Sequence, residues 1–141
     1  MPFPALADYE TLLYNLREQY ADHITASTVH LYSTSALTAR VTGSIQFASG
    51  LELRVAEFID FLSGQIRDYS YTIYLGAEKV RWYDPQPHPD NAALAPTFPH
   101  HYHTPPDIKH NRQPASGISF DAPNLPTLIR DCIELGKTLR P

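Results

Sequence analysis

Residues 37–61 read LTARVTGSIQFASGLELRVAEFIDF, and this stretch decides the fold of the 141-residue chain. On both sides of the segment Ala48-Ser49-Gly50, apolar and polar residues alternate with a period of two. This is the pattern of strands that bury one face. Gly50 supplies the positive φ that a tight turn requires. The stretch therefore predicts an antiparallel hairpin formed by residues 37–47 and 51–61.

Further strands are predicted on both sides of this hairpin. Residues 24–32 are rich in Thr, Val and Tyr, which favour strands. Glycine-containing turns lead from the hairpin into residues 66–75 and from there into residues 79–84. Short turns between successive strands make neighbours antiparallel. We therefore expect an antiparallel meander of about five strands.

Helices are predicted at both ends of the chain. Apolar residues recur at the spacing of an amphipathic helix over residues 4–22, and again after Asn124, a residue suited to the N-cap. Two helices packed on one face of a twisted antiparallel sheet give an α+β sandwich. With 43% apolar residues and no internal repeat, residues 1–141 are predicted to form a single domain.

The composition excludes several classes of protein. A net charge of −4 argues against a strongly basic nucleic-acid binder, although local charge can still contact a few phosphates. The lone Cys132 excludes an internal disulfide, fits a reducing compartment and lies among the apolar residues of the last helix. No apolar run approaches the roughly 18–20 residues that span a membrane, and no signal peptide is apparent. We expect a soluble, cytoplasmic protein without a membrane partner.

Residues 83–112 hold most of the candidate chemistry. The segment contains five of the seven histidines, and prolines stiffen its backbone. A long loop in a compact domain is usually functional or disordered, and the apolar residues here argue against disorder. We therefore expect an ordered loop that presents imidazoles at a ligand or active site. The alternative is a surface loop whose histidines only form hydrogen bonds.

The element FPHHYH, residues 98–103, is predicted to be extended because prolines flank it. An extended backbone sends His101 and His103 to the same side. Joined by His88 or Asp84, they would form either a metal-free acid–base pair or a zinc or manganese site. Neither HExxH nor CxxC occurs in the chain. We therefore expect no cofactor, and keep a divalent metal as the alternative.

Other candidate residues lie on the predicted strands. Glu57 interrupts the apolar face of its strand, where a carboxylate needs a partner or a raised pKa. It is therefore a candidate general base, unless a strand end turns it to solvent. Arg81 is a candidate phosphate contact, because a guanidinium makes paired, charge-assisted hydrogen bonds. Arg67, Tyr69 and Tyr71 share a face and are candidates for substrate contact, although tyrosine also packs on sheets.

Several segments of the chain resemble the TumE family, small bacterial proteins regarded as toxins of type II toxin–antitoxin modules. The segments occur in the family's order: LELRVAEFIDF at 51–61, IRDYSYTIYL at 66–75, VRWYDPQPH at 80–88 and FPHHYH at 98–103. The resemblance runs from about Gly43 to the C-terminal helix. RWYD…PH and FPHH are its more specific parts.

The resemblance implies a toxin that a small protein antitoxin neutralises and that acts on RNA or translation. The candidate residues would support metal-independent RNA cleavage. Glu57 or a histidine would take the 2′-OH proton, and His101 or His103 would protonate the leaving oxygen. Arg81 would stabilise the charged phosphorane, so these four residues are predicted to act as one site. The predicted substrate contacts are Arg67, Tyr69, Tyr71, Asp84, His88 and His100.

Two other functions stay open beside this ribonuclease-like toxin. A metal-dependent hydrolase or nuclease would use Asp84, His88, His101 and His103 as metal ligands. A non-enzymatic module would block or regulate a partner through the same surface. If the protein is a toxin, we expect its antitoxin to contact the proline-stiffened loop.

Overall fold

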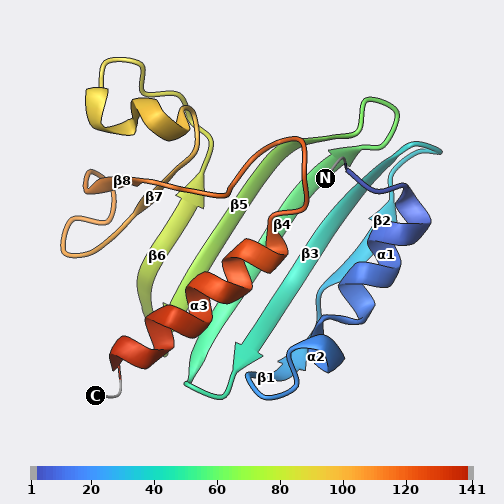
Figure 1. The fold of residues 1–141 in the computed structure, drawn as a ribbon, viewed down its shortest axis with the longest axis horizontal. Helices are drawn as coiled ribbons and strands as arrows, with labels where there is room; N and C mark the ends of the chain where they lie inside the picture. The colour runs from blue at the N-terminus through green and yellow to red at the C-terminus, as the bar shows by residue number, and fades with distance from the viewer. Residues whose placement is uncertain (1–2, 140–141) are drawn as a thin grey trace.

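The computed structural model describes residues 3–139 as an open antiparallel sheet with helices from both ends of the chain on one side (Figure 1). The helices are α1 (Leu6–Tyr14), α2 (Leu16–Gln19), the 3-10 helix η1 (Ala92–Thr97) and α3 (Leu125–Leu139). The strands are β1 (Ile24–Ser27), β2 (His30–Ser33), β3 (Thr38–Phe47), β4 (Leu51–Asp60), β5 (Gln65–Leu75), β6 (Glu78–Asp84), β7 (His101–His103) and β8 (Arg112–Pro114). This arrangement confirms the predicted α+β class.

The strands follow the chain across the sheet. Their order is β1-β3-β4-β5-β6-β7-β8, and β2 pairs with β3 beside β1. The hairpin of β3 and β4 is antiparallel, with Thr38 opposite Asp60 and Gln46 opposite Glu52. The alternation in residues 37–61 therefore predicted this hairpin correctly.

The prediction of five strands was wrong, because the sheet has eight strands within residues 3–139. Residues 24–32 do not form one strand but contribute to β1 and β2, which are separated at Thr28 and Val29. At this point Gly43 of β3 has a φ of +141°, and a Cβ there would lie only 2.5 Å from the Thr28 carbonyl oxygen. The close approach of two backbones thus interrupts the edge of the sheet.

The strands β7 and β8 were missed for a different reason. Each has three residues; β7 lies inside residues 83–112, which the sequence predicted to be a loop, and β8 begins at Arg112, the last residue of that segment. Proline lacks the N–H that a strand ladder uses, so its presence argues against a strand unless the strand lies at an edge. β8 is such an edge strand, and it contains Pro114.

The N-terminal helix predicted over residues 4–22 is divided at Asn15 into α1 and α2. At the other end, α3 buries the apolar face that the sequence predicted, including Cys132. Asn124 immediately precedes α3, and its side chain hydrogen-bonds to Ser119 and to the Tyr71 hydroxyl. Among the described residues, none of the helices is both long and apolar enough to cross a bilayer.

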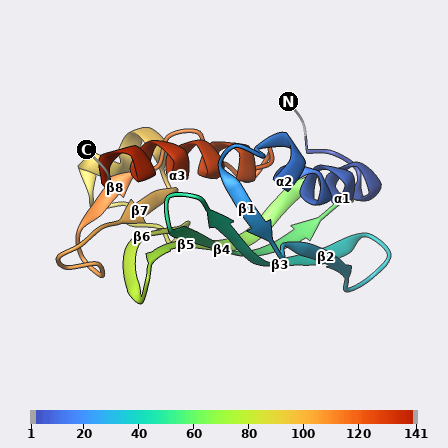
Figure 2. The same ribbon diagram turned by 90° about the horizontal axis from the view of Figure 1, so that it is seen from below.

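The two faces of the sheet have different environments. Figure 2 shows α1, α2 and α3 on the same side of the sheet. Alternate strand residues such as Ile45, Leu53 and Ile73 are fully buried beneath them. We call the opposite side the open face. It carries Arg40, Arg54, Phe58, Asp68, Ser70, Thr72, Tyr74 and Trp82, which alternate with the buried residues.

Candidate functional site

The pairing of β6 with β7 brings two histidines to one carboxylate. The register places Trp82 opposite His103 and Asp84 opposite His101, so these side chains share a face. Tyr83, between Trp82 and Asp84, points the other way and hydrogen-bonds to α3. We call Asp84, His101 and His103 the His–Asp cluster. Its geometry confirms that His101 and His103 face the same side.

The polar atoms of the His–Asp cluster converge. Asp84 Oδ2 lies 2.8 Å from His103 Nε2, and Asp84 Oδ1 lies 3.2 Å from His101 Nε2. The two Nε2 atoms are themselves 3.2 Å apart. His101 is 1% exposed and His103 3%, whereas Asp84 is 9% exposed. A ligand arriving from solvent would therefore meet Asp84 first.

The surroundings of His101 determine where its protons lie. Its Nδ1 is 3.1 Å from the carbonyl oxygen of Pro99, so Nδ1–H donates there and Nε2 of the neutral ring carries a lone pair. That lone pair faces Asp84 Oδ1 at 3.2 Å. Two electron-rich atoms at this distance repel each other. A cation held between these donor atoms would remove the repulsion.

Aromatic side chains surround the His–Asp cluster. Trp82 stacks on His103 with ring centroids 4.5 Å apart, and its indole N–H donates to Ser70. The half-buried ring of His88 meets His101 edge to face at 5.0 Å. Within residues 3–139, the buried Nδ1 of His103 has no hydrogen-bond partner. The cluster is thus packed tightly from the sides.

Asp84 also lines a cleft of about 430 Å³, which we call the Asp84 cleft. The other lining residues are Asp68, Tyr69, Ser70, Trp82, Pro85, Gln86 and Pro87. Because Asp68, Ser70 and Trp82 belong to the open face, the cleft connects this face with the cluster. His88 lines a different depression, of about 250 Å³, together with Phe98.

Two further histidines of the loop lie near the cluster. Burial lowers the pKa of His100, whose Nδ1 hydrogen-bonds to the Tyr69 hydroxyl. Burial also lowers the pKa of His88, and the nearby charges of Arg112 and His101 act in the same direction. Both imidazoles therefore favour the neutral form. His100 points away from the cluster, as expected for the neighbour of His101 in an extended segment.

Glu57 lies in the core on the helix-covered face of the sheet. It is 2% exposed, and its carboxylate accepts hydrogen bonds from the hydroxyls of Tyr9 and Tyr71. Burial raises its pKa, while these two hydrogen bonds oppose the rise. The predicted hydrogen-bonding partners are confirmed, and an orientation toward solvent is excluded.

Arg81 also lies on the helix-covered face. Its Nη1 donates to the Tyr83 hydroxyl at 3.2 Å, and its guanidinium lies 4.4 Å from the ring centroid of Tyr102. The Tyr83 hydroxyl in turn donates to Asp131 of α3 at 2.8 Å. Arg81 therefore belongs to a polar contact between the sheet and α3.

The expectation that Glu57 and Arg81 form one site with His101 and His103 needs correction. Alternation along the strands sends Glu57 and Arg81 toward the helices, and sends the two histidines toward the opposite side of β6. The sequence placed all four near one another because it did not reveal which face of the sheet the loop would join.

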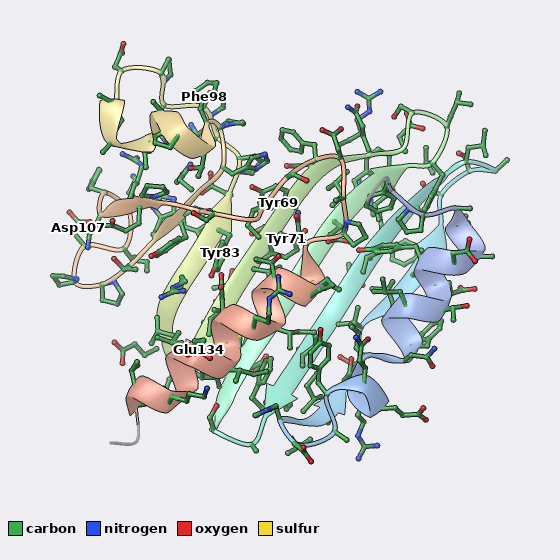
Figure 3. All side chains as sticks on the ribbon, in the orientation of Figure 1. Tyr69, Tyr71, Tyr83, Phe98, Asp107 and Glu134 are labelled. Carbon is green, nitrogen blue, oxygen red and sulfur yellow. The ribbon has the colours of Figure 1, made fainter. Side chains whose placement is uncertain are left out.

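The predicted substrate contact Tyr71 needs the same correction, because it lies on the helix-covered face, as does Tyr69. Tyr69 is 4% exposed and Tyr71 is fully buried, and Figure 3 shows both beside α3 together with Tyr83. Tyr71 therefore has no surface for a substrate, whereas Tyr69 contributes to the lining of the Asp84 cleft. Arg67 has an exposed side chain that pairs with Asp60 at 3.3 Å.

Trp82 was not among the predicted site residues, although its ring forms one wall of the cluster. Period-two alternation within residues 79–84 already places Trp82 and Asp84 on one face. That signal could have found it. The carbonyl of Pro99 had no such signal, because its role depends on the conformation of the loop.

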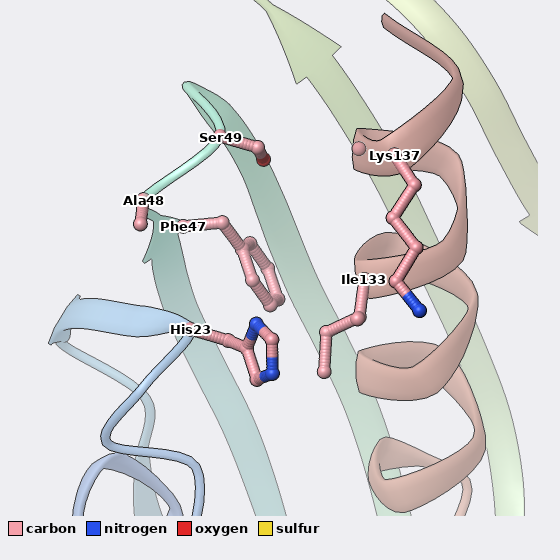
Figure 4. A pocket seen from close by; sticks show the side chains of 7 residues that line it. His23, Phe47, Ala48, Ser49, Ile133 and Lys137 are labelled. Carbon is pink, nitrogen blue, oxygen red and sulfur yellow. The ribbon is translucent and has the colours of Figure 1, made fainter. Parts of the chain in front are cut away.

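A separate cavity of about 170 Å³ lies between the β3–β4 turn and the last turns of α3 (Figure 4). Its lining residues are His23, Phe47, Ala48, Ser49, Ile133, Gly136 and Lys137. A Cβ on Gly136 would come within 2.9 Å of the Ser49 side chain, so glycine lets α3 approach the turn closely. The lining residues include no acidic side chain, in contrast to the Asp84 cleft.

The fold and the site together define a small α+β protein with a buried His–Asp cluster beside an open sheet face. The model of one family, described as Toxin TumE, matches residues 13–135. The chain therefore belongs to the TumE family, which confirms the resemblance seen in its sequence. Membership supports a toxin of a toxin–antitoxin system, with an antitoxin as its partner. No curated protein and no solved structure matches the chain.

Proposed function

We propose that this protein is the toxin of a toxin–antitoxin module and that it cleaves RNA at the Asp84 cleft. The observation that carries this proposal is the chemistry of the open face, which places aromatic rings and cations beside the cleft. Single-stranded nucleic acids bind such surfaces, because each base can stack on an aromatic ring.

Rings and cations are paired along the open face. The guanidinium of Arg54 lies 4.0 Å from the ring centroid of Tyr74, and the ammonium of Lys79 lies 5.1 Å from Trp82. A further pair is formed by Arg40 and Phe58, at 5.0 Å. The pairs come from different strands, so they extend across the sheet toward the cluster.

Stacking is expected to contribute more than charge to this binding. Arg54 is paired with Glu52 at 2.8 Å, and the whole chain has a net charge of −4. A cationic side chain that is already paired with a carboxylate releases few counterions when it contacts a phosphate. Stacking of a base on an aromatic ring contributes about 1–3 kcal/mol to the binding free energy, whichever base it is. RNA would therefore be held by its bases, next to the Asp84 cleft.

Burial of the histidines limits how the cluster can act. A general acid or base must come within hydrogen-bonding reach of the reacting group. His101 and His103 are 1% and 3% exposed, whereas Asp84 lines the cleft. The proposal therefore assigns direct access to Asp84 and an indirect part to the two histidines. The separation of Glu57 and Arg81 from the cluster also removes two members of the predicted metal-independent mechanism.

The test is induced expression of the wild type, Asp84→Asn and the matched control Asp107→Asn. Asp107 is an exposed aspartate that pairs with His110 at 3.1 Å, so the control removes a similar pair elsewhere. Growth and the 5′ ends of total RNA are measured after induction. We expect arrest and new 5′ ends with the wild type and the control, and neither with folded Asp84→Asn.

Two outcomes would contradict this proposal. If folded Asp84→Asn still produced arrest and new RNA ends, the Asp84 cleft would not be the site of cleavage. If the wild type arrested growth without any RNA breakdown, the non-enzymatic alternative would replace the ribonuclease.

A further inference from the structure

We infer that the His–Asp cluster binds a divalent transition-metal ion, with Asp84, His101 and His103 as its protein ligands. The inference names a cofactor for the proposed site. Its link to RNA cleavage rests on the proposed function, whereas metal binding can be measured independently. The cluster is a group of three buried side chains whose donor atoms all lie within 4.8 Å of one another.

The distances in the cluster suit a shared ion. Zinc bonds to histidine nitrogen and carboxylate oxygen measure about 2.0–2.2 Å, so neighbouring ligand atoms lie about 3.0–3.5 Å apart in tetrahedral or octahedral geometry. The two Nε2 atoms are 3.2 Å apart, and the carboxylate oxygens lie 3.2 Å from His101 and 2.8 Å from His103. One ion can therefore contact all three side chains with small adjustments.

The lone pair on His101 supports the same conclusion. The Pro99 carbonyl accepts the Nδ1 proton and leaves Nε2 pointing at Asp84 and His103. Metal-binding histidines are commonly oriented by such a hydrogen bond from the other ring nitrogen to a carbonyl or carboxylate. A cation between the donor atoms replaces the repulsion of lone pairs with attraction.

The ligand types indicate the class of metal. Imidazole favours first-row transition metals such as zinc, iron and nickel over magnesium and calcium, which prefer oxygen ligands. Two histidines and one carboxylate leave coordination positions for water or substrate, as in catalytic metal sites. Asp84 lines the cleft, so these positions are expected on that side.

His88 is not among the ligands of this inferred site. Its ring meets His101 edge to face with centroids 5.0 Å apart, and its own surface faces a different depression. The set of four ligands considered from the sequence is therefore reduced to three. His88 covers the cluster from the side.

The experiment uses the full chain, purified without added metal, stripped with a chelator and then titrated with Zn²⁺ or Co²⁺. The variants are Asp84→Asn and His101→Gln, with His110→Gln as the matched control for an exposed histidine paired with an aspartate. Metal content, the Co²⁺ absorption spectrum and the melting temperature are measured. Metal that binds only the folded state raises the melting temperature by mass action.

We expect one Zn²⁺ or Co²⁺ per chain and a higher melting temperature for the wild type and His110→Gln. Loss of a partner that merely orients a ligand costs about 10–100-fold in affinity, so loss of a ligand should cost at least that much. Unchanged melting and no Co²⁺ absorption in the wild type would overturn the inference. Equal affinity in folded Asp84→Asn would overturn it as well.

The outcomes also separate this inference from the proposed function. If Asp84→Asn loses metal but still cleaves RNA, the metal site stands and the proposed cleavage site falls. If the wild type binds no metal and cleaves RNA equally well with and without chelator, while folded Asp84→Asn does not cleave, the metal site falls and the proposed cleavage site stands.

Discussion

The hydroxyl of Tyr71 on β5 donates a hydrogen bond to the carboxylate of Glu57 on β4, and both residues are buried. Tyr9 of α1 donates to the other carboxylate oxygen. Asn124, at the start of α3, donates to the Tyr71 hydroxyl at 3.1 Å. One buried carboxylate therefore joins the helices from both ends of the chain to the middle of the sheet.

The Glu57 network predicts a pH dependence of stability. Because burial raises its pKa, folded protein binds this proton more tightly than the unfolded chain does. The contribution is complete below the ordinary glutamate pKa of 4.5 and is lost as the pH rises through the raised value. We expect the free energy of unfolding of the wild type, minus that of Glu57→Gln, to fall over this window. Denaturant titrations at several pH values measure it, and a flat or rising difference would contradict the prediction.

Gly43→Ala is predicted to destabilise the sheet. The new Cβ would lie 2.5 Å from the Thr28 carbonyl oxygen, and the residue would have to keep a φ of +141°. Gly64→Ala is the matched control, since Gly64 also has a positive φ but nothing within 4 Å of its Cβ. Thermal melting should show a clearly larger loss for Gly43→Ala. Equal losses of melting temperature in the two variants would mean that the backbone at Thr28 moves away from the new Cβ at little cost.

Tyr74→Ala is predicted to weaken binding of single-stranded RNA. Tyr74 lies on the open face under Arg54, and removal of one stacking ring costs about 1–3 kcal/mol, or roughly 5–150-fold in affinity. Tyr14→Ala removes an exposed tyrosine from α1, on the other side of the sheet, and should leave the affinity unchanged. Fluorescence anisotropy with a labelled oligonucleotide compares the variants. Equal RNA affinities of Tyr74→Ala and Tyr14→Ala would mean that RNA does not bind over Tyr74 on the open face.

Antitoxin binding is predicted to protect residues 84–112 from hydrogen exchange. An antitoxin that neutralises the proposed site must cover the Asp84 cleft or displace its walls, and Pro85, Gln86 and Pro87 belong to those walls. Exposed amides between β6 and η1 should therefore exchange more slowly in the complex. If no amide in residues 84–112 is protected, the antitoxin acts through another surface.

The sequence predicted those parts of the fold that depend on local patterns. Alternation in residues 37–61 gave the β3–β4 pairing, and the spacing of apolar residues gave the buried face of α3. The break between β1 and β2 was not predictable in this way. It arises where Thr28 meets Gly43, a contact between residues that are distant in sequence.

The candidate site was predictable in part for the same reason. The same-side placement of His101 and His103 follows from an extended backbone, which the flanking prolines favour. Their partner depends on which strand β7 joins and in which register. Pairing with β6 selects Asp84 and excludes Glu57, and no feature of the chain near the histidines reports that choice.

The two ends of the sheet restrict how another protein can attach to it. A partner that extends a sheet needs a continuous row of backbone N–H and C=O groups along an outer strand. Here one margin consists of β1 and β2, of four residues each and interrupted between them, and the other is the three-residue β8 with Pro114. Neither edge of the sheet is a good template for the addition of a strand. We therefore expect an antitoxin to bind through side chains on a broad face or on the loops, and not by adding a strand.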